Sequence, residues 1–165
     1  MKPINWPRAI LAAVAAFVVS QLAFIILFGN PIVQSWFYTA ASGQSAKFVA
    51  VWNTLQPLPP LSAKWSGLAV VPPRAFATMG LMLFWLLCVT LVYATVADSV
   101  PGKGWRKGIT YGVMVWAIAF VFFGAFFHFN VLNMPIVFVL GEWVLEAVIS
   151  IAAGVTIAAI YKPAR

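Results

Sequence analysis

Two acidic residues, Glu142 and Glu146, stand one helical turn apart within the apolar run 136–161. A helix formed by this run would be long enough to cross a bilayer. Carboxylates at membrane depth cost free energy unless they are paired, hydrated or protonated, so such residues are candidates for a functional site. Because two carboxylates one turn apart repel each other, one of them is expected to keep its proton at neutral pH. A proton held in this way can be passed along.

Other polar residues are predicted to lie in the same half of the membrane. These candidates come from three further apolar segments, and they are Gln21, Arg74, Thr78 and His128. Together with Glu142 and Glu146 they could converge in one pocket that opens outward.

Three interpretations of this polar cluster remain open. In a structural interpretation, Arg74 or His128 pairs with Glu142, and Glu146 bonds to a hydroxyl or tryptophan N–H of a neighbouring helix. In the second, the glutamates form a proton or cation pathway. In the third, the glutamates and His128 bind a metal, although the chain lacks the Glu-x-x-His pair of di-iron bundles. A haem held by two histidines is excluded within one chain, because His128 is the single histidine.

The composition identifies lipid as the solvent for much of the surface. Hydrophobic residues make up 64% of the chain and charged residues 8%, whereas a soluble domain needs far more charge. The net charge of +7 does not indicate nucleic-acid binding, because the basic residues cluster beside the expected span ends. A single cysteine, Cys88, rules out a disulfide framework or a cysteine-based zinc site within the chain.

Four apolar runs have the length of about 20 residues that a membrane-spanning helix requires. They are residues 8–28, 75–97, 108–128 and 136–161. Helices are expected because lipid cannot satisfy free backbone groups. The sequence therefore predicts one all-α domain over residues 1–165, an integral membrane bundle of four transmembrane helices.

The basic residues predict the orientation of this bundle. Seven of them fall on one side of the predicted spans: Lys2, Arg8, Lys103, Arg106, Lys107, Lys162 and Arg165. Positive charge favours the cytoplasmic side, so both termini are expected in the cytoplasm. Trp6, Trp105 and Tyr161 are expected to form an aromatic belt at that interface.

The loop 30–73 is the one long segment predicted outside the membrane, and it is rich in aromatic residues. Within residues 44–56, Phe48, Val51, Trp52 and Leu55 recur at helical spacing. This pattern predicts a short amphipathic helix that lies on the outer leaflet or caps the bundle.

Small residues at intervals of four predict where helices pack closely. One set, in the first run, is Ala12, Ala16 and Ser20, and the other, in the fourth run, is Ser150, Gly154 and Ala158. Because such residues let backbones approach each other, the first and fourth spans are predicted to pair. The phenylalanine-rich third span is expected to face lipid, a neighbouring subunit or a bound pigment.

Three stretches carry a resemblance to known proteins. They read AVWNTLQPLPP, LVYATVADSVPGKGWRKGITYGVMVW and GEWVLEAVISIAAGVTIAAIYKP. In these stretches the chain resembles an uncharacterised family of small bacterial integral membrane proteins with four spans. The shared features of the last span are Trp143, Glu146, Gly154, Tyr161 and Lys162, and Glu142 is not among them. The resemblance implies a fold rather than an activity.

These observations favour a non-catalytic membrane protein of the bacterial inner membrane, an accessory or scaffolding subunit. Its expected partners are membrane lipids, other membrane proteins or copies of itself, with no nucleic acid and no cofactor beyond a possible lipid or pigment. One alternative is a small proton-coupled transporter or channel that uses Glu146. Another is a protein that binds a lipid, quinone or pigment.

Overall fold

The computed structural model describes residues 3–28, 30–33, 73–124, 126–127 and 136–162. Its long elements are α1 (Trp6–Phe28), α4 (Pro73–Val96), α5 (Trp105–Trp116) and α6 (Ile136–Ile160). A short 3-10 turn, η3 (Ala97–Ser99), follows α4, and a π-helical segment, η4 (Ala117–Gly124), continues α5. The described residues form no strand, and four helices are long and apolar enough to cross a membrane. The prediction of an all-α multi-pass membrane protein with four helices is confirmed.

The helix bounds differ modestly from those predicted from the sequence. α5 begins at Trp105, three positions before the predicted start of the third span. Arg106 and Lys107, which were expected in a loop, therefore lie in its first turn. This extension is compatible with a membrane because basic side chains at a helix end reach the head-group region. The loop 30–73 and its predicted amphipathic helix lie outside the described residues, apart from its first four residues and Pro73.

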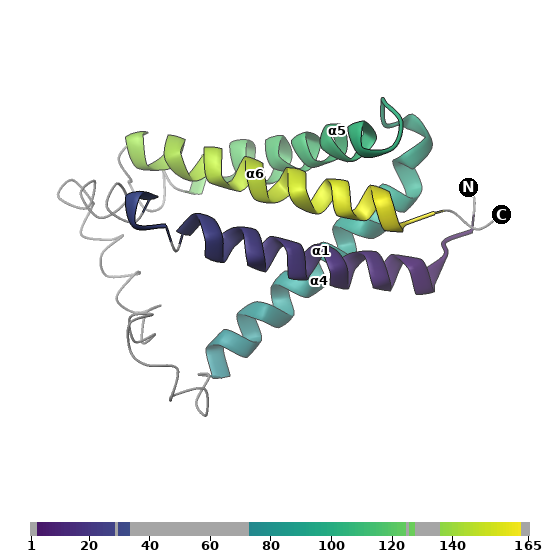
Figure 1. Ribbon diagram of the computed structural model, residues 1–165, viewed down its shortest axis with the longest axis horizontal. Coiled ribbons are helices and arrows are strands. Elements are labelled where there is room, and N and C mark those ends of the chain that lie inside the picture. The colour runs from purple at the N-terminus through teal and green to yellow at the C-terminus, as the bar shows by residue number, and fades with distance from the viewer. Residues whose placement is uncertain (1–2, 29, 34–72, 125, 128–135, 163–165) are drawn as a thin grey trace.

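α6 is the central element of the bundle, because it packs against α5 on one side and against α1 on another. Figure 1 shows these three helices running along the long axis of the molecule. α4 packs mainly against α1. It crosses the other helices obliquely, so that one of its ends lies nearer to α5 and α6 than the other end does (Figure 1). The start of α1 and the end of α6 lie at the same end of the molecule as the turn between α4 and α5 (Figure 1).

The core lies between the four helices, in the half of the bundle nearest to the termini. Its buried residues are Ala9, Ala12, Ala16, Leu86, Tyr93, Val100, Tyr111, Ala153, Ile157 and Tyr161. Three of these are tyrosines. The ring of Tyr93 packs edge-on against Tyr111 and Tyr161, at centroid distances of 4.9 and 6.2 Å. Tyrosine combines apolar area with a hydroxyl that needs a partner when it is buried.

Tyr111 and Tyr161, which pack on either side of Tyr93, each make a hydrogen bond to another segment through the hydroxyl group. Tyr111 of α5 donates to the backbone carbonyl of Val89 in α4 at 2.5 Å. The hydroxyl of Tyr161 accepts from the backbone N–H of Asn5 at 3.4 Å, just before α1. Tyr161 is therefore a core residue with only 4% of its surface exposed. The prediction that it belongs to an interfacial aromatic belt was wrong, because its ring fills the junction of α4 and α6.

Three glycines bring α5 and α6 into direct backbone contact. A Cβ atom added at Gly108 would lie 2.5 Å from Cα of Val155, and one at Gly112 would lie 2.6 Å from Cα of Ile151. From the other side, a Cβ at Gly154 would lie 2.5 Å from the carbonyl oxygen of Gly108. Contacts this short are not possible for real Cβ atoms, so this glycine seam (Gly108, Gly112 and Gly154) requires glycine. Small residues spaced by four allow such close packing in membranes.

The seam corrects part of the predicted pairing between the first and fourth spans. α1 does pack against α6, and Ala12 and Ala16 share the core cluster with Ala153 and Ile157. Gly154, however, faces α5. Neighbouring residues of a helix point in directions about 100° apart, since the helix has 3.6 residues per turn. The side of α6 that carries Ala153 therefore faces α1, and the side that carries Gly154 does not.

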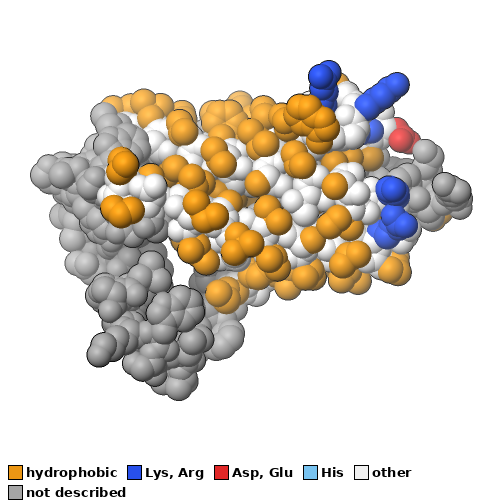
Figure 2. All heavy atoms as spheres, viewed as in Figure 1, with side chains coloured by type: hydrophobic (Ala, Val, Ile, Leu, Met, Phe, Trp, Pro, Cys, Tyr) orange, Lys and Arg blue, Asp and Glu red, His pale blue; other side chains and the backbone are white. Residues whose placement is uncertain are grey.

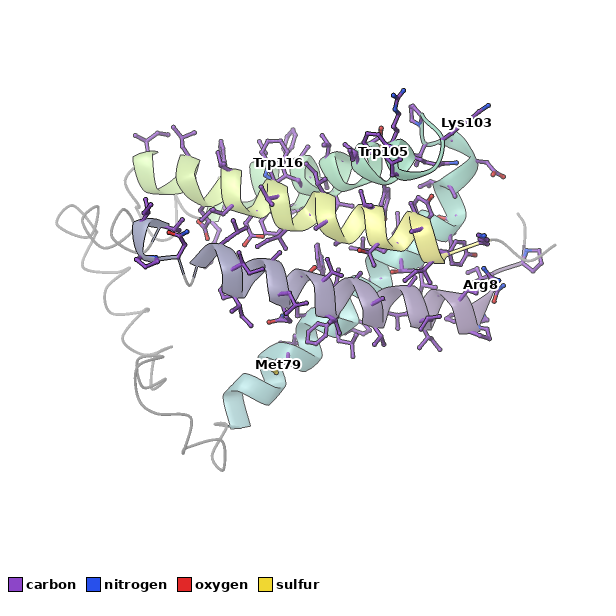
Figure 3. All side chains as sticks on the ribbon, in the orientation of Figure 1. Arg8, Met79, Lys103, Trp105 and Trp116 are labelled. Carbon is purple, nitrogen blue, oxygen red and sulfur yellow. The ribbon has the colours of Figure 1, made fainter. Side chains whose placement is uncertain are left out.

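The surface divides into an apolar body and a charged end. In Figure 2 hydrophobic side chains cover the visible length of the helices, and Lys and Arg side chains gather at one end. We call this the basic end; its described basic residues are Arg8, Lys103, Arg106, Lys107 and Lys162. Figure 3 shows Arg8, Lys103 and Trp105 toward this end. Trp6 and Trp105 are 54% and 61% exposed there, as tryptophans at a membrane interface are.

Candidate functional site

Glu146 lies on the face of α6 that packs against α1. Val139, Glu146 and Ala153 are spaced by seven residues, which places them on one stripe of the helix. Val139 and Ala153 are buried, and Ala153 belongs to the core cluster that contains Ala12 and Ala16 of α1. Glu146 therefore lies within the helix interface rather than on the lipid-facing surface.

Glu142 lies one turn farther from the basic end than Glu146 and is half-buried, as Glu146 is. One of its carboxylate oxygens, Oε2, is fully buried. The two side chains thus form a pair of acids inside the apolar body of the protein. Burial of this kind is costly for charged carboxylates, as the sequence indicated.

Ser20 of α1 lies at about the same depth as Glu146. The hydrogen bond between Asn5 and Tyr161 brings the start of α1 and the end of α6 to about the same position along the long axis of the bundle, at the basic end. Both helices rise about 1.5 Å per residue, and Ser20 is as far along the chain from Asn5 as Glu146 is from Tyr161. Ser20 also continues the buried face formed by Ala9, Ala12 and Ala16. The hydroxyl and the carboxylate consequently meet the same interface at the same level.

The hydroxyl of Ser20 has no hydrogen-bond partner in the described structure, and its residue is 1% exposed. The described threonine hydroxyls donate to a backbone carbonyl of the preceding turn. Thr90 donates to the carbonyl of Leu86, and Thr156 donates to that of Ala152, both at 2.8 Å. Ser20 does not make this common local bond, so its oxygen is left available for another group.

Gln21 and Trp116 connect the neighbouring helices around this level. The amide of Gln21 donates to the sulfur of Met82 in α4 at 2.8 Å. This hydrogen bond joins Gln21 to α4 rather than to the glutamates. The indole of Trp116 on α5, labelled in Figure 3, donates to the backbone carbonyl of Trp143 in α6 at 2.8 Å. The indole N–H of Trp143 itself is buried without a hydrogen-bond partner in the described structure.

These bonds bear on the structural interpretation of the polar cluster. That interpretation expected Glu146 to bond to a hydroxyl or to a tryptophan N–H. Ser20 and Trp143 have no partner, and Trp116 donates to a backbone carbonyl. None of these three donors bonds to Glu146 in the described structure, so the partner expected for Glu146 stays a prediction.

The side chains of the remaining predicted members of the cluster lie outside the described structure. His128 is not described, and Arg74 and Thr78 lie in α4 at positions whose side chains are not described. Within the described residues, no group of three His, Cys, Asp or Glu side chains could hold a metal ion.

A second feature was not visible in the sequence, namely an apolar groove between α4 and α5. It has a volume of about 310 Å³ and is lined by Val92, Val96, Ser99, Val100, Tyr111, Met114, Val115 and Ile118. We call it the lateral groove. Beyond it, Trp85 of α4 meets Phe120 of η4 edge-on at 6.3 Å. The groove exists because α4 packs mainly on α1 and leaves α5 at its side.

Comparisons with protein-family models, curated proteins and solved structures found no match to the chain.

Proposed function

We propose that the protein is a non-catalytic accessory or scaffolding subunit that packs against other membrane-protein subunits. The lateral groove is the observation that carries this proposal. The groove lies between two helices long and apolar enough to cross a membrane. Its occupant must therefore be apolar and embedded in the membrane, and we assign it to a transmembrane helix of a partner subunit.

The lining of the lateral groove suits a protein helix. Apart from Ser99 and Tyr111, whose hydroxyl is already bonded to Val89, the lining side chains are aliphatic or methionine. Met114 and Ile118 are 43% and 59% exposed, so they are available to a partner. Methionine adapts its shape to irregular surfaces. Close packing of side chains drives helix association in lipid, where water expulsion contributes nothing.

The setting we propose is the inner membrane of a bacterium, with both termini in the cytoplasm. The basic end supports this orientation, because lysine and arginine near span ends favour the cytoplasmic side. In this arrangement the lateral groove would lie in the cytoplasmic half of the membrane, next to the turn that carries Lys103.

Native mass spectrometry of the protein, extracted gently from its own membrane, tests the proposal. We expect other membrane subunits, or several copies of the chain, to accompany it in a fixed ratio. A protein that emerges as a monomer would contradict the proposal. Co-extraction of a lipid or pigment alone would favour a small-molecule occupant of the lateral groove instead.

A substitution in the groove sharpens this test. Met114→Trp should fill the groove and release the partner, while Val113→Trp should leave the complex intact. Val113 is the matched control because it is adjacent on α5, similarly exposed at 40%, and does not line the groove. Equal retention of the partner by both variants would place the interface elsewhere.

A further inference from the structure

We propose that Glu146 and Ser20 form a proton-binding site at the interface of α1 and α6, with Glu142 as the second carboxylate on the outer side. This proposal is independent of whether partner subunits occupy the lateral groove. It assigns to the protein a buried site that binds a proton, in addition to a packing role.

The geometry supplies both halves of a proton site. A protonated carboxyl group needs an acceptor for its O–H, and a buried hydroxyl with no partner is such an acceptor. Ser20 is fully buried, is unpartnered, and lies at the depth of Glu146 on the facing helix. A proton on Glu146 would therefore satisfy the Ser20 oxygen and remove a charge from the membrane interior at the same time.

Glu142 provides a position from which a proton can reach Glu146. The two glutamates lie one turn apart on α6, a spacing at which side chains of a helix are neighbours. In the transfer, a proton leaves the carboxyl group of Glu142 and binds the carboxylate of Glu146, so that one acid loses what the other gains. Glu142 lies toward the end of the bundle away from the basic end, and protons would arrive from that side.

The other titratable groups on the packed helices lie away from this level. Those described on α1, α4 and α5 that lie toward the basic end are Arg8, Tyr93, Arg106, Lys107 and Tyr111. Cys88 of α4 is exposed and so does not face the interface. Among the described side chains, Glu142 is therefore the acid or base adjacent to Glu146.

Labelling with a hydrophobic carbodiimide in native membranes tests the site without purification. This reagent reacts with protonated carboxyl groups, and peptide mass spectrometry locates the adduct. We expect Glu146 to be labelled at acidic and neutral pH, and labelling to fall as the pH rises and the proton leaves. Absence of labelling at every pH would overturn the proposal, and so would suppression of labelling by sodium ions at constant pH, which would indicate a metal cation.

Two hydroxyl variants separate the proposed site from a merely structural carboxylate. Ser20→Ala removes the acceptor of the protonated carboxyl group and should reduce labelling at neutral pH. Thr90→Val is the control, because Thr90 is also fully buried but lies on α4 and already donates its hydroxyl to Leu86. Equal labelling of both variants and the wild type would overturn the role of Ser20.

Infrared spectroscopy reports the bound proton directly. The wild type at neutral pH should show the C=O band of a protonated carboxyl group, and Glu146→Gln should lose it. Glutamine keeps the shape and loses the titration, and folding is checked by thermal unfolding in detergent. A folded Glu146→Gln protein that keeps the whole band would refute the proposal.

Discussion

At the scale of single residues, the glycine seam shows how one missing methyl group determines the approach of two helices. Gly112 faces the backbone at Ser150 and Ile151 so closely that an added Cβ would lie 2.6 Å from two of its atoms. Backbone cannot move aside as a flexible side chain can. Gly80 of α4 offers the opposite case, because an added Cβ there would meet no atom within 4 Å.

The two glycines lead to opposite expectations for the same substitution. Gly112→Ala should lower the free energy of unfolding by about 1–3 kcal/mol, since overpacking forces the helices apart. Gly80→Ala should leave it unchanged or raise it by up to about 1 kcal/mol, because alanine favours a helix more than glycine does. Thermal unfolding in detergent, followed by circular dichroism, measures both. A Gly112→Ala protein as stable as the wild type would show that α5 and α6 are not in contact there.

At the scale of elements, α4 and α5 are joined mainly by side chains rather than by backbone contact. The hydroxyl of Tyr111 donates across this gap to Val89, and the ring of Tyr111 packs on Tyr93 of α4. Phe120 and Trp85 make the second contact. This arrangement leaves the lateral groove between the helices and concentrates their attachment in a few residues.

Removing the Tyr111 hydroxyl should loosen α4 measurably. Tyr111→Phe keeps the ring contact and deletes the hydrogen bond, so we expect a loss of about 1 kcal/mol in the free energy of unfolding. Thr95→Val is the control: its hydroxyl bonds within its own helix, to Val92, and is exposed, so a change within about 0.5 kcal/mol is expected. Hydrogen exchange of the α4 backbone amides should rise in Tyr111→Phe alone. If exchange stays unchanged, the hydroxyl does not hold α4.

Some features of the helices could be predicted from the sequence and others could not. The number of spans followed from hydropathy because a bilayer requires long apolar helices whatever their neighbours are. The glycine seam was readable from Gly108 and Gly112, which stand four apart, but that signal was missed in favour of the small residues of α1. The oblique path of α4 could not be predicted, because it depends on side-chain fits such as that of Tyr93 between two other rings.

The candidate site shows the same limit. The two glutamates were identified from their type and their place in an apolar run. Ser20 was singled out only as a small packing residue, because burial and a missing partner are properties of the fold. The rotation of α6, which brings Glu146 to α1 and Gly154 to α5, could not be determined from a helix that is apolar on most faces.

At the scale of the whole molecule, the distribution of charge gives the bundle a direction. The described basic side chains of α1, of the α4–α5 turn, of the first turn of α5 and of the segment after α6 gather at the basic end. The start of α1 and the end of α6 lie there as well (Figure 1). Met79, labelled in Figure 3, lies in the part of α4 that is away from the basic end. Insertion into a membrane with this asymmetry should be strongly directional.

Cysteine labelling tests the direction in intact cells. Cys88 is the single cysteine, so Cys88→Ser provides a background in which one new thiol reports one position. Asn30→Cys, at the end of α1 away from the basic end, should react with a membrane-impermeant maleimide added to intact cells. Pro101→Cys, in the exposed turn between α4 and α5, should react only after the membrane is permeabilised. The reverse pattern would mean that the basic end faces outward, and the proton route from Glu142 to Glu146 would then begin on the cytoplasmic side.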